Sequence, residues 1–238
     1  MSCRELVKLC LVSIIYRTTL TPSKVELITA WLPTRSWYRL TGRAPELVKA
    51  GGFRLEDPEG EVGIEFMAAT DESGDQPTTY HVPLTYRAVP LEGADDALIG
   101  TMEHGVLGQR WAYDGTRDPV LVAQLMALIQ GVAEPQAQSE SHTPDLTVRT
   151  RAAVAVPVQA TAFSATDGLE ETEILVVVAT EGQLAIRVPR ILRPLPLVAG
   201  GGNEASQAFG GHGYVTAPPW RLAGDETSRA VFATAEQC

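Results

Sequence analysis

The stretch that most constrains the fold is residues 97–131, where a predicted β-hairpin leads directly into a strongly marked helix. Gly105 and Gly108 supply the bend between two apolar runs. Asp118 suits the N-cap and Pro119 the first helical position. Apolar residues then follow at helical spacing up to a glycine that can end the helix in the left-handed conformation. We expect this helix to be covered on most sides, at the core of an α+β domain.

Composition and charge limit the classes of function. The chain has 238 residues, 45% of them hydrophobic, and a formal net charge of -10. This length allows a sizeable core, and the negative charge argues against binding to nucleic acid. The three cysteines form no C-x-x-C pair and the four histidines lack the spacing of metal ligands. We therefore expect no disulfide framework, metal or cofactor, and a cytoplasmic protein.

The N-terminal region contains an apolar run at 9–15 that follows two basic residues and superficially resembles a signal peptide. The run is too short to span a membrane, and no small-residue cleavage site follows it. We expect residues 1–13 to be disordered or to hold part of a first strand at 11–17. No membrane association is predicted.

Residues 14–132 are predicted to form one domain, an antiparallel sheet with two helices. The first helix follows a cap at Thr21 or Ser23 and stops at Pro33. A strand is predicted at 78–89, where Pro83 indicates a sheet edge or a bulge.

The second half of the chain differs from the first in composition and hydrophobic pattern. Residues 133–144 are polar and aperiodic, and we interpret them as a linker. Residues 145–238 contain short β-type runs without helical patterns, which predicts a smaller all-β region of hairpins. Residues 199–213 form a flexible glycine-rich loop in this interpretation.

Aromatic and arginine side chains gather directly after the first predicted helix, at Arg35, Trp37, Tyr38 and Arg39. Arginine stacks on an aromatic face while its planar fork binds a carboxylate or phosphate. The cluster therefore suggests a partner-binding surface. The alternative, which the sequence favours, is a packed corner in which the two aromatic rings cover the end of the helix.

Three charged residues, Asp114, Arg117 and Asp118, precede the second helix. We interpret them as a structural cluster whose capping and ion pairing hold the hairpin to the helix. His104 beside Glu103 is a possible proton-transfer pair, but a turn histidine bonded to the backbone is favoured. No G-x-S-x-G motif occurs, and we assign no catalytic residue.

Several motifs of residues 18–131 together resemble a known family. They are Trp31-Leu32-Pro33 with Arg35-Ser36-Trp37-Tyr38, the strand Tyr80-His81-Val82-Pro83-Leu84-Thr85-Tyr86-Arg87, the hairpin pieces Leu98-Ile99-Gly100 and Val106-Leu107-Gly108, and Tyr113-Asp114-Gly115-Thr116 before Asp118-Pro119. In this order they resemble the N-terminal cap of actinobacterial maltokinases and related aminosugar kinases. In that family a β-rich cap precedes a kinase similar to aminoglycoside phosphotransferases.

The resemblance does not extend to kinase chemistry. Phosphoryl transfer in such kinases requires a catalytic aspartate, an asparagine a few residues on and a second aspartate for Mg²⁺, and the sequence after Gly131 has no such set. The resemblance implies a stand-alone, non-catalytic accessory or regulatory module of trehalose, maltose-phosphate and α-glucan (glycogen) metabolism. Its expected partner is a kinase, an α-glucan enzyme or a second copy of itself.

A second hypothesis assigns the chain to a different class of function. A small carbohydrate-binding protein or glucan-active enzyme would place an aromatic site between the two halves. The residues that would form it are Trp37, Tyr38, Trp111, Tyr113 and Trp220. Sugar binding would require these rings to be exposed beside polar groups.

Overall fold

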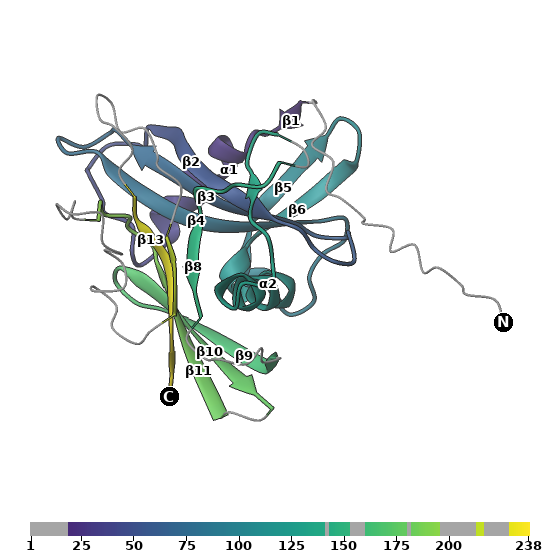
Figure 1. Cartoon of the computed structure of the whole chain (residues 1–238). Helices are drawn as coiled ribbons and strands as arrows, with labels where there is room; N and C mark the ends of the chain where they lie inside the picture. The colour runs from purple at the N-terminus through teal and green to yellow at the C-terminus, as the bar shows by residue number, and fades with distance from the viewer. Residues whose placement is uncertain (1–18, 141–142, 153–159, 180–181, 196–212, 217–228) are drawn as a thin grey trace.

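The computed structural model describes residues 19–140, 143–152, 160–179, 182–195, 213–216 and 229–238. Within them lie two antiparallel sheets and two α-helices, so the predicted α+β class is confirmed (Figure 1). The first strand predicted at 11–17 and residues 199–212 of the predicted glycine-rich loop lie outside the described residues, whereas Gly213 begins a strand (Gly213–Thr216). None of the helices in the described part of the chain has the length and apolar character needed to cross a membrane.

The first sheet has the strand order β1-β5-β6-β4-β3-β2-β7. Its strands are β1 (Leu20–Thr21), β2 (Leu47–Leu55), β3 (Gly63–Asp71), β4 (Thr78–Arg87), β5 (Leu98–His104), β6 (Gly108–Asp114) and β7 (Gln136–Ala137). The second sheet has the order β8-β12-β13-β11-β10-β9. Its strands are β8 (Arg149–Arg151), β9 (Ala160–Asp167), β10 (Glu171–Val178), β11 (Gly182–Pro189), β12 (Gly213–Thr216) and β13 (Val231–Gln237).

The first helix, α1 (Lys24–Trp31), covers one face of the first sheet. Ser23 caps it, because its Oγ accepts a hydrogen bond from the Glu26 N–H at 3.3 Å while the Glu26 carboxylate accepts one from the Ser23 N–H at 2.7 Å. The short 3-10 turn η1 (Leu32–Thr34) follows directly. The predicted helix, its cap and its end at the proline are therefore confirmed.

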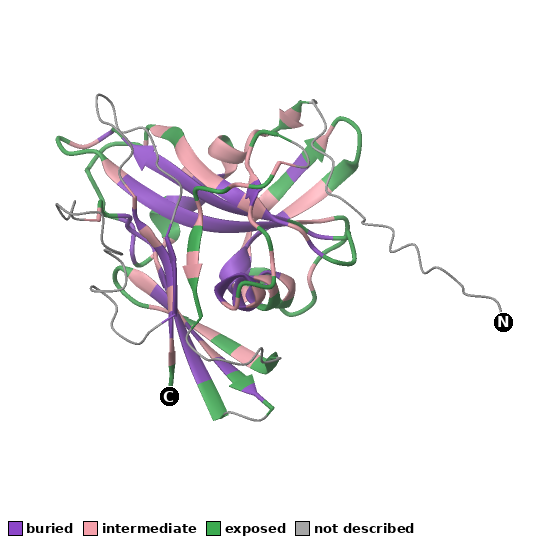
Figure 2. Cartoon of the chain, viewed as in Figure 1, coloured by how far each residue is buried: buried purple, intermediate pink, exposed green. Residues whose placement is uncertain are grey.

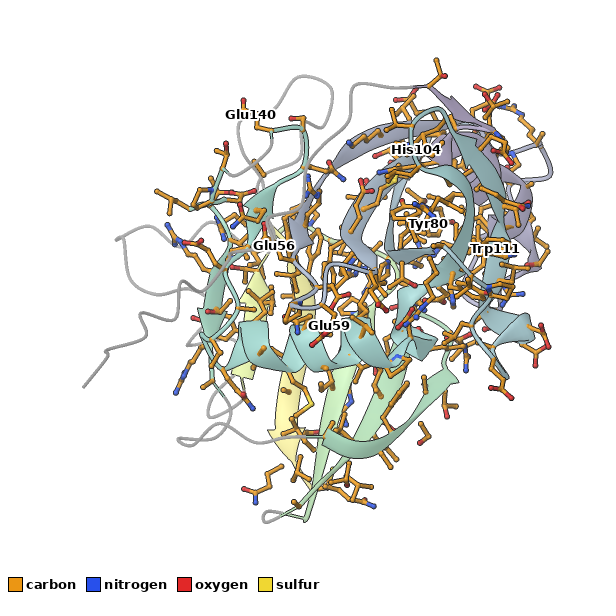
Figure 3. The ribbon with its side chains drawn as sticks, turned by 90° about the vertical axis from the view of Figure 1, so that its right-hand side faces the viewer. Glu56, Glu59, Tyr80, His104, Trp111 and Glu140 are labelled. Carbon is orange, nitrogen blue, oxygen red and sulfur yellow. The ribbon has the colours of Figure 1, made fainter. Side chains whose placement is uncertain are left out.

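The second helix, α2 (Pro119–Ile129), lies between the two sheets (Figures 1 and 3). The Asp118 carboxylate accepts a hydrogen bond from the Val120 N–H at 2.9 Å, and Gly131 has φ +72°, as the sequence predicts. Most of the helix is buried, including Leu125. Its apolar side chains contact those of both sheets, and Figure 2 shows the buried residues concentrated in α2 and the inner strands.

Pro83 lies in an inner strand rather than at the outer edge of the sheet, because β4 runs between β3 and β6. One side of β4 nevertheless changes partner at this point. The His81 N–H donates to the Arg190 carbonyl at 2.9 Å, whereas pairing with β6 begins only at Leu84, opposite Asp114. Alternate residues of a strand direct their backbone groups to the same side. Pro83 therefore lies between the residue that pairs with Arg190 and the residues that pair with β6. No partner strand requires an N–H donor at this position, so the proline is tolerated.

The segment 133–144, predicted as a linker, contributes β7 to the first sheet. Gln136 pairs with Arg54 of β2 and is buried. The polar composition that suggested a linker is explained by the position of β7 at the edge of the sheet. The division into domains at 14–132 and 145–238 stays a prediction, although one cluster of buried side chains includes residues of both parts.

Candidate functional site

The corner after α1 buries its aromatic side chains. Trp37 is 1% exposed and contacts Trp31 edge-to-face at 5.7 Å between ring centroids. The Tyr38 hydroxyl donates to the Asp71 carboxylate at 2.9 Å, and burial together with this bond raises the pKa of Tyr38 to about 12. The arrangement matches the packed-corner alternative. Trp37 and Tyr38 are not available as a surface.

The arginines of the same corner remain accessible. Arg35 lies over the Trp31 ring at 5.0 Å. Arg39 donates from Nη2 to the Glu170 carboxylate at 2.8 Å, and Arg193 donates to both oxygens of the same group at 2.7 and 2.9 Å. Hydrogen bonds from these two arginines lower the pKa of Glu170. The corner thus meets the turn between β9 and β10 at the surface.

Two exposed leucines flank this arginine–glutamate cluster. Leu40 is 82% exposed and follows Arg39, while Leu169 is 80% exposed and precedes Glu170. The Ser36 hydroxyl also donates to the Gly168 carbonyl at 3.3 Å, which brings the two segments together. We call this surface the corner patch and define it by Arg35, Arg39, Leu40, Leu169, Glu170 and Arg193.

A buried ion pair lies at the junction of the two parts of the chain, where the corner after α1 meets β6 and β10. Arg190 and Asp114 are both fully buried, and Arg190 donates from Nη2 to the Asp114 carboxylate at 2.6 Å and to the Thr116 hydroxyl at 2.9 Å. Its Nε donates to the Thr172 hydroxyl at 2.7 Å. The guanidinium also lies over the Trp37 ring at 4.9 Å. One arginine thereby connects the end of β6, strand β10 and the corner.

The other two members of the predicted charged cluster have separate partners. Arg117, in the 3-10 turn η3 (Gly115–Arg117), donates to the Asp167 carboxylate at 3.1 Å and to the Ala165 carbonyl at 2.9 Å. Asp118 accepts two hydrogen bonds from Arg87, both at 2.7 Å. The three residues therefore do not pair with one another. Arg117 links η3 to β9, and Asp118 links the start of α2 to β4.

His81 is a buried residue of the junction that the sequence analysis did not single out. Its Nδ1 lies 3.0 Å from the Pro189 carbonyl and therefore carries the proton of this hydrogen bond, while Nε2 has no partner within the described residues. Burial, together with the charge of Arg190, lowers the pKa of His81 to about 3. The ring is neutral at pH 7. Only its place in the Tyr80–Arg87 motif could have drawn attention to it.

The remaining sequence candidates do not form a common site. Tyr113 is buried, and its hydroxyl oxygen accepts a hydrogen bond from the Leu91 N–H at 2.9 Å. Trp111 is half-buried, and Trp220 lies outside the described residues. His104 accepts at Nδ1 from the N–H groups of the turn, Val106 and Leu107. Among the residues that the structure describes, no group of three or more His, Cys, Asp or Glu side chains could hold a metal ion.

Comparison with known families agrees with the motifs of the first half. Residues 31–118 match the maltokinase N-terminal cap domain. The resemblance predicted from the motifs is therefore confirmed for residues 31–118. The match includes the corner, β4 and the charged residues before α2, but it ends before Glu170, Arg190 and Arg193. No curated protein matches the chain.

Proposed function

We propose that the chain is a non-catalytic binding module that docks an acidic segment of a partner protein on the corner patch. The observation that supports this is the pair of leucines, each at least 80% exposed, beside a cluster of arginines. Exposed apolar side chains rimmed by polar groups are typical of interaction sites. Arginine is also enriched at protein interfaces.

The charge of the patch supports a partner segment that is acidic. The patch contains three arginines and one glutamate, whereas the whole chain has a net charge of -10. A local positive surface attracts acidic segments, whereas the net negative charge of the whole chain repels other copies of it. Carboxylates of the partner would share Arg39 and Arg193 with Glu170, and its apolar side chains would cover Leu40 and Leu169.

The cap family suggests the biological setting of this partner. The match to a maltokinase cap makes a kinase or an α-glucan enzyme of maltose-phosphate, trehalose or glycogen metabolism the expected class of partner. We further propose that the chain alone does not phosphorylate maltose. ATP turnover by the purified protein that depends on maltose would contradict this second statement.

Site-specific photo-crosslinking tests the docking proposal. A photoreactive residue is placed at Leu40, and a control is placed at Leu146, which is 89% exposed and lies in the second part of the chain. In native lysate we expect a defined partner to crosslink at Leu40 and not at Leu146. The Arg39→Glu and Arg193→Glu double variant should abolish that crosslink. Identical products at both positions, a yield unaffected by charge reversal, or crosslinking only to this chain would each overturn the proposal.

A further inference from the structure

Glu170 is an acidic side chain of the chain itself that already occupies two arginines of the corner patch. Arg193 donates from Nη2 to both oxygens of its carboxylate, at 2.7 and 2.9 Å. Arg39 donates from its own Nη2 to one of these oxygens at 2.8 Å. Hydrogen bonds between two ionised groups are the stronger kind in proteins. The patch therefore holds an internal ligand with the same chemistry as the acidic segment proposed above.

The backbone around this contact is anchored to the rest of the fold. The Glu170 carbonyl accepts a hydrogen bond from the Arg190 N–H at 2.7 Å. The Arg39 N–H donates to the Tyr80 hydroxyl at 3.0 Å. Because the main chain is held in this way, Glu170 stays close to its arginines even when its carboxylate leaves them.

The side chains of the contact are free to exchange partners. Those of Arg39, Glu170 and Arg193 are each at least 46% exposed. Exposed ion pairs contribute little to stability, since water replaces a lost partner. Breaking the contact therefore costs the fold little. A carboxylate attached to the same chain nevertheless competes at a high effective concentration with a carboxylate from outside.

This competition affects which segments the patch can accept. An incoming carboxylate that only replaces Glu170 exchanges one charged contact for an equivalent one, so the net gain in free energy is small. Leu40 and Leu169 are different, because both are exposed in the free chain. Covering them removes apolar surface from water, which is favourable. Net binding is therefore greatest for a segment that combines carboxylates with apolar side chains.

We propose that Glu170 is a built-in competitor of the corner patch, which makes the patch selective for acidic segments that also carry apolar side chains. This inference rests on the docking function proposed above. In the free chain Glu170 neutralises part of the positive charge of Arg39 and Arg193. When a partner docks, its carboxylate takes over hydrogen bonds from these arginines and its apolar side chains cover the two leucines. Glu170 thus lowers the affinity for every acidic segment and rejects those that are acidic alone.

Fluorescence anisotropy of two labelled peptides tests the competition on the full chain. One probe is an octapeptide of alternating leucine and glutamate, and the other alternates serine and glutamate. We expect tighter binding of the leucine peptide. Glu170→Gln should strengthen that binding by about two- to fivefold, the scale of one exposed ion pair. The matched control is Glu171→Gln, which removes the same charge from the next residue, and it should have a clearly smaller effect because the Glu171 carboxylate lies 3.7 Å from Arg187 instead.

A double-mutant cycle assigns the effect to the arginine contact. In a chain that carries Arg193→Met, Glu170→Gln should strengthen binding of the leucine peptide much less, because the competitor has lost its main partner. An equal gain in both backgrounds would show that Glu170 acts only by general repulsion, and would overturn the proposal.

Three further outcomes separate this inference from the docking function on which it rests. Equal affinity for the two peptides, no gain from Glu170→Gln, or the same gain from Glu171→Gln would each overturn the competitor and leave docking of acidic segments standing. Failure of the unaltered chain and of Glu170→Gln to bind the leucine peptide would contradict both proposals.

Discussion

Two sets of ion pairs join the same two parts of the chain, one inside the junction and one at its surface. In the buried pair of Arg190 and Asp114 the side chains are 0% and 2% exposed, whereas in the pair of Arg39 and Glu170 they are 51% and 46% exposed. Removing one partner of a buried pair leaves a charge without water or counter-ion. Water replaces a lost partner at the surface. Only the inner pair is therefore expected to determine stability, and only the outer pair can exchange its partner.

The largest effect is expected from Arg190→Met, which leaves the buried Asp114 carboxylate uncompensated. We expect the free energy of unfolding to fall by about 3–5 kcal/mol in urea titrations. Adding Asp114→Asn should recover part of the loss, because the uncompensated charge disappears. The control is Arg187→Met, which removes an arginine of a partly exposed network with Glu173 and Glu236. An equal loss in the control would remove the distinction between the inner and outer pairs.

The apolar side of the junction should respond almost as strongly. Leu125 of α2 is fully buried between the two sheets, so Leu125→Ala should lower the free energy of unfolding by roughly 2–5 kcal/mol, as expected for an emptied core leucine. Chemical denaturation measures the change. Leu146→Ala is the matched control, since Leu146 is 89% exposed and its truncation should have no measurable effect.

The pH dependence of stability should show that His81 is buried and remains neutral in the folded chain. Its pKa falls from an ordinary 6.5 to about 3 in the folded chain. Between these values the unfolded chain binds a proton that the folded chain does not, so stability is lost as pH falls through this window. The slope attributable to His81 is about 1.4 kcal/mol per pH unit. His81→Gln should flatten the curve, whereas His104→Gln, in the exposed hairpin turn, should change it little. Parallel curves for wild type and His81→Gln would show that the ring titrates normally.

The smallest change in stability is expected for the outer pairs. Arg39→Ala and Arg193→Ala should leave thermal unfolding unchanged within error, because both side chains are more than half exposed. Their effect should appear in partner crosslinking instead. A clear loss of thermal stability would show that the ion pairs of the corner patch stabilise the fold, as the buried pair does.

The parts of the fold that the sequence predicted depend on local signals. Ser23, Asp118 and Pro119 mark helix starts through contacts within four residues, and both helices were predicted with their caps. The charged residues before α2 were also predicted to be structural. Their partners were not, because Arg190 lies 76 residues from Asp114 and no local pattern connects them.

The candidate site was predicted only in part for the same reason. The aromatic and arginine cluster after α1 is plain in the sequence, but the burial of Trp37 depends on Trp31 and on the distant Arg190. Leu169 and Glu170 join Arg39 through a turn 131 residues further along the chain. Side-chain types are visible in a sequence, whereas their assembly depends on strand pairing.

The change of partner beside Pro83 has a consequence for synthesis of the chain on the ribosome. The backbone groups of Thr79 and His81 pair with Arg190 and Leu192, which are translated about 110 residues later. Until then this half of β4 is an open strand edge, the kind of edge that pairs with other chains. A nascent chain that has exposed all of its first sheet therefore still needs its own C-terminal part, or a chaperone, to shield that edge from aggregation.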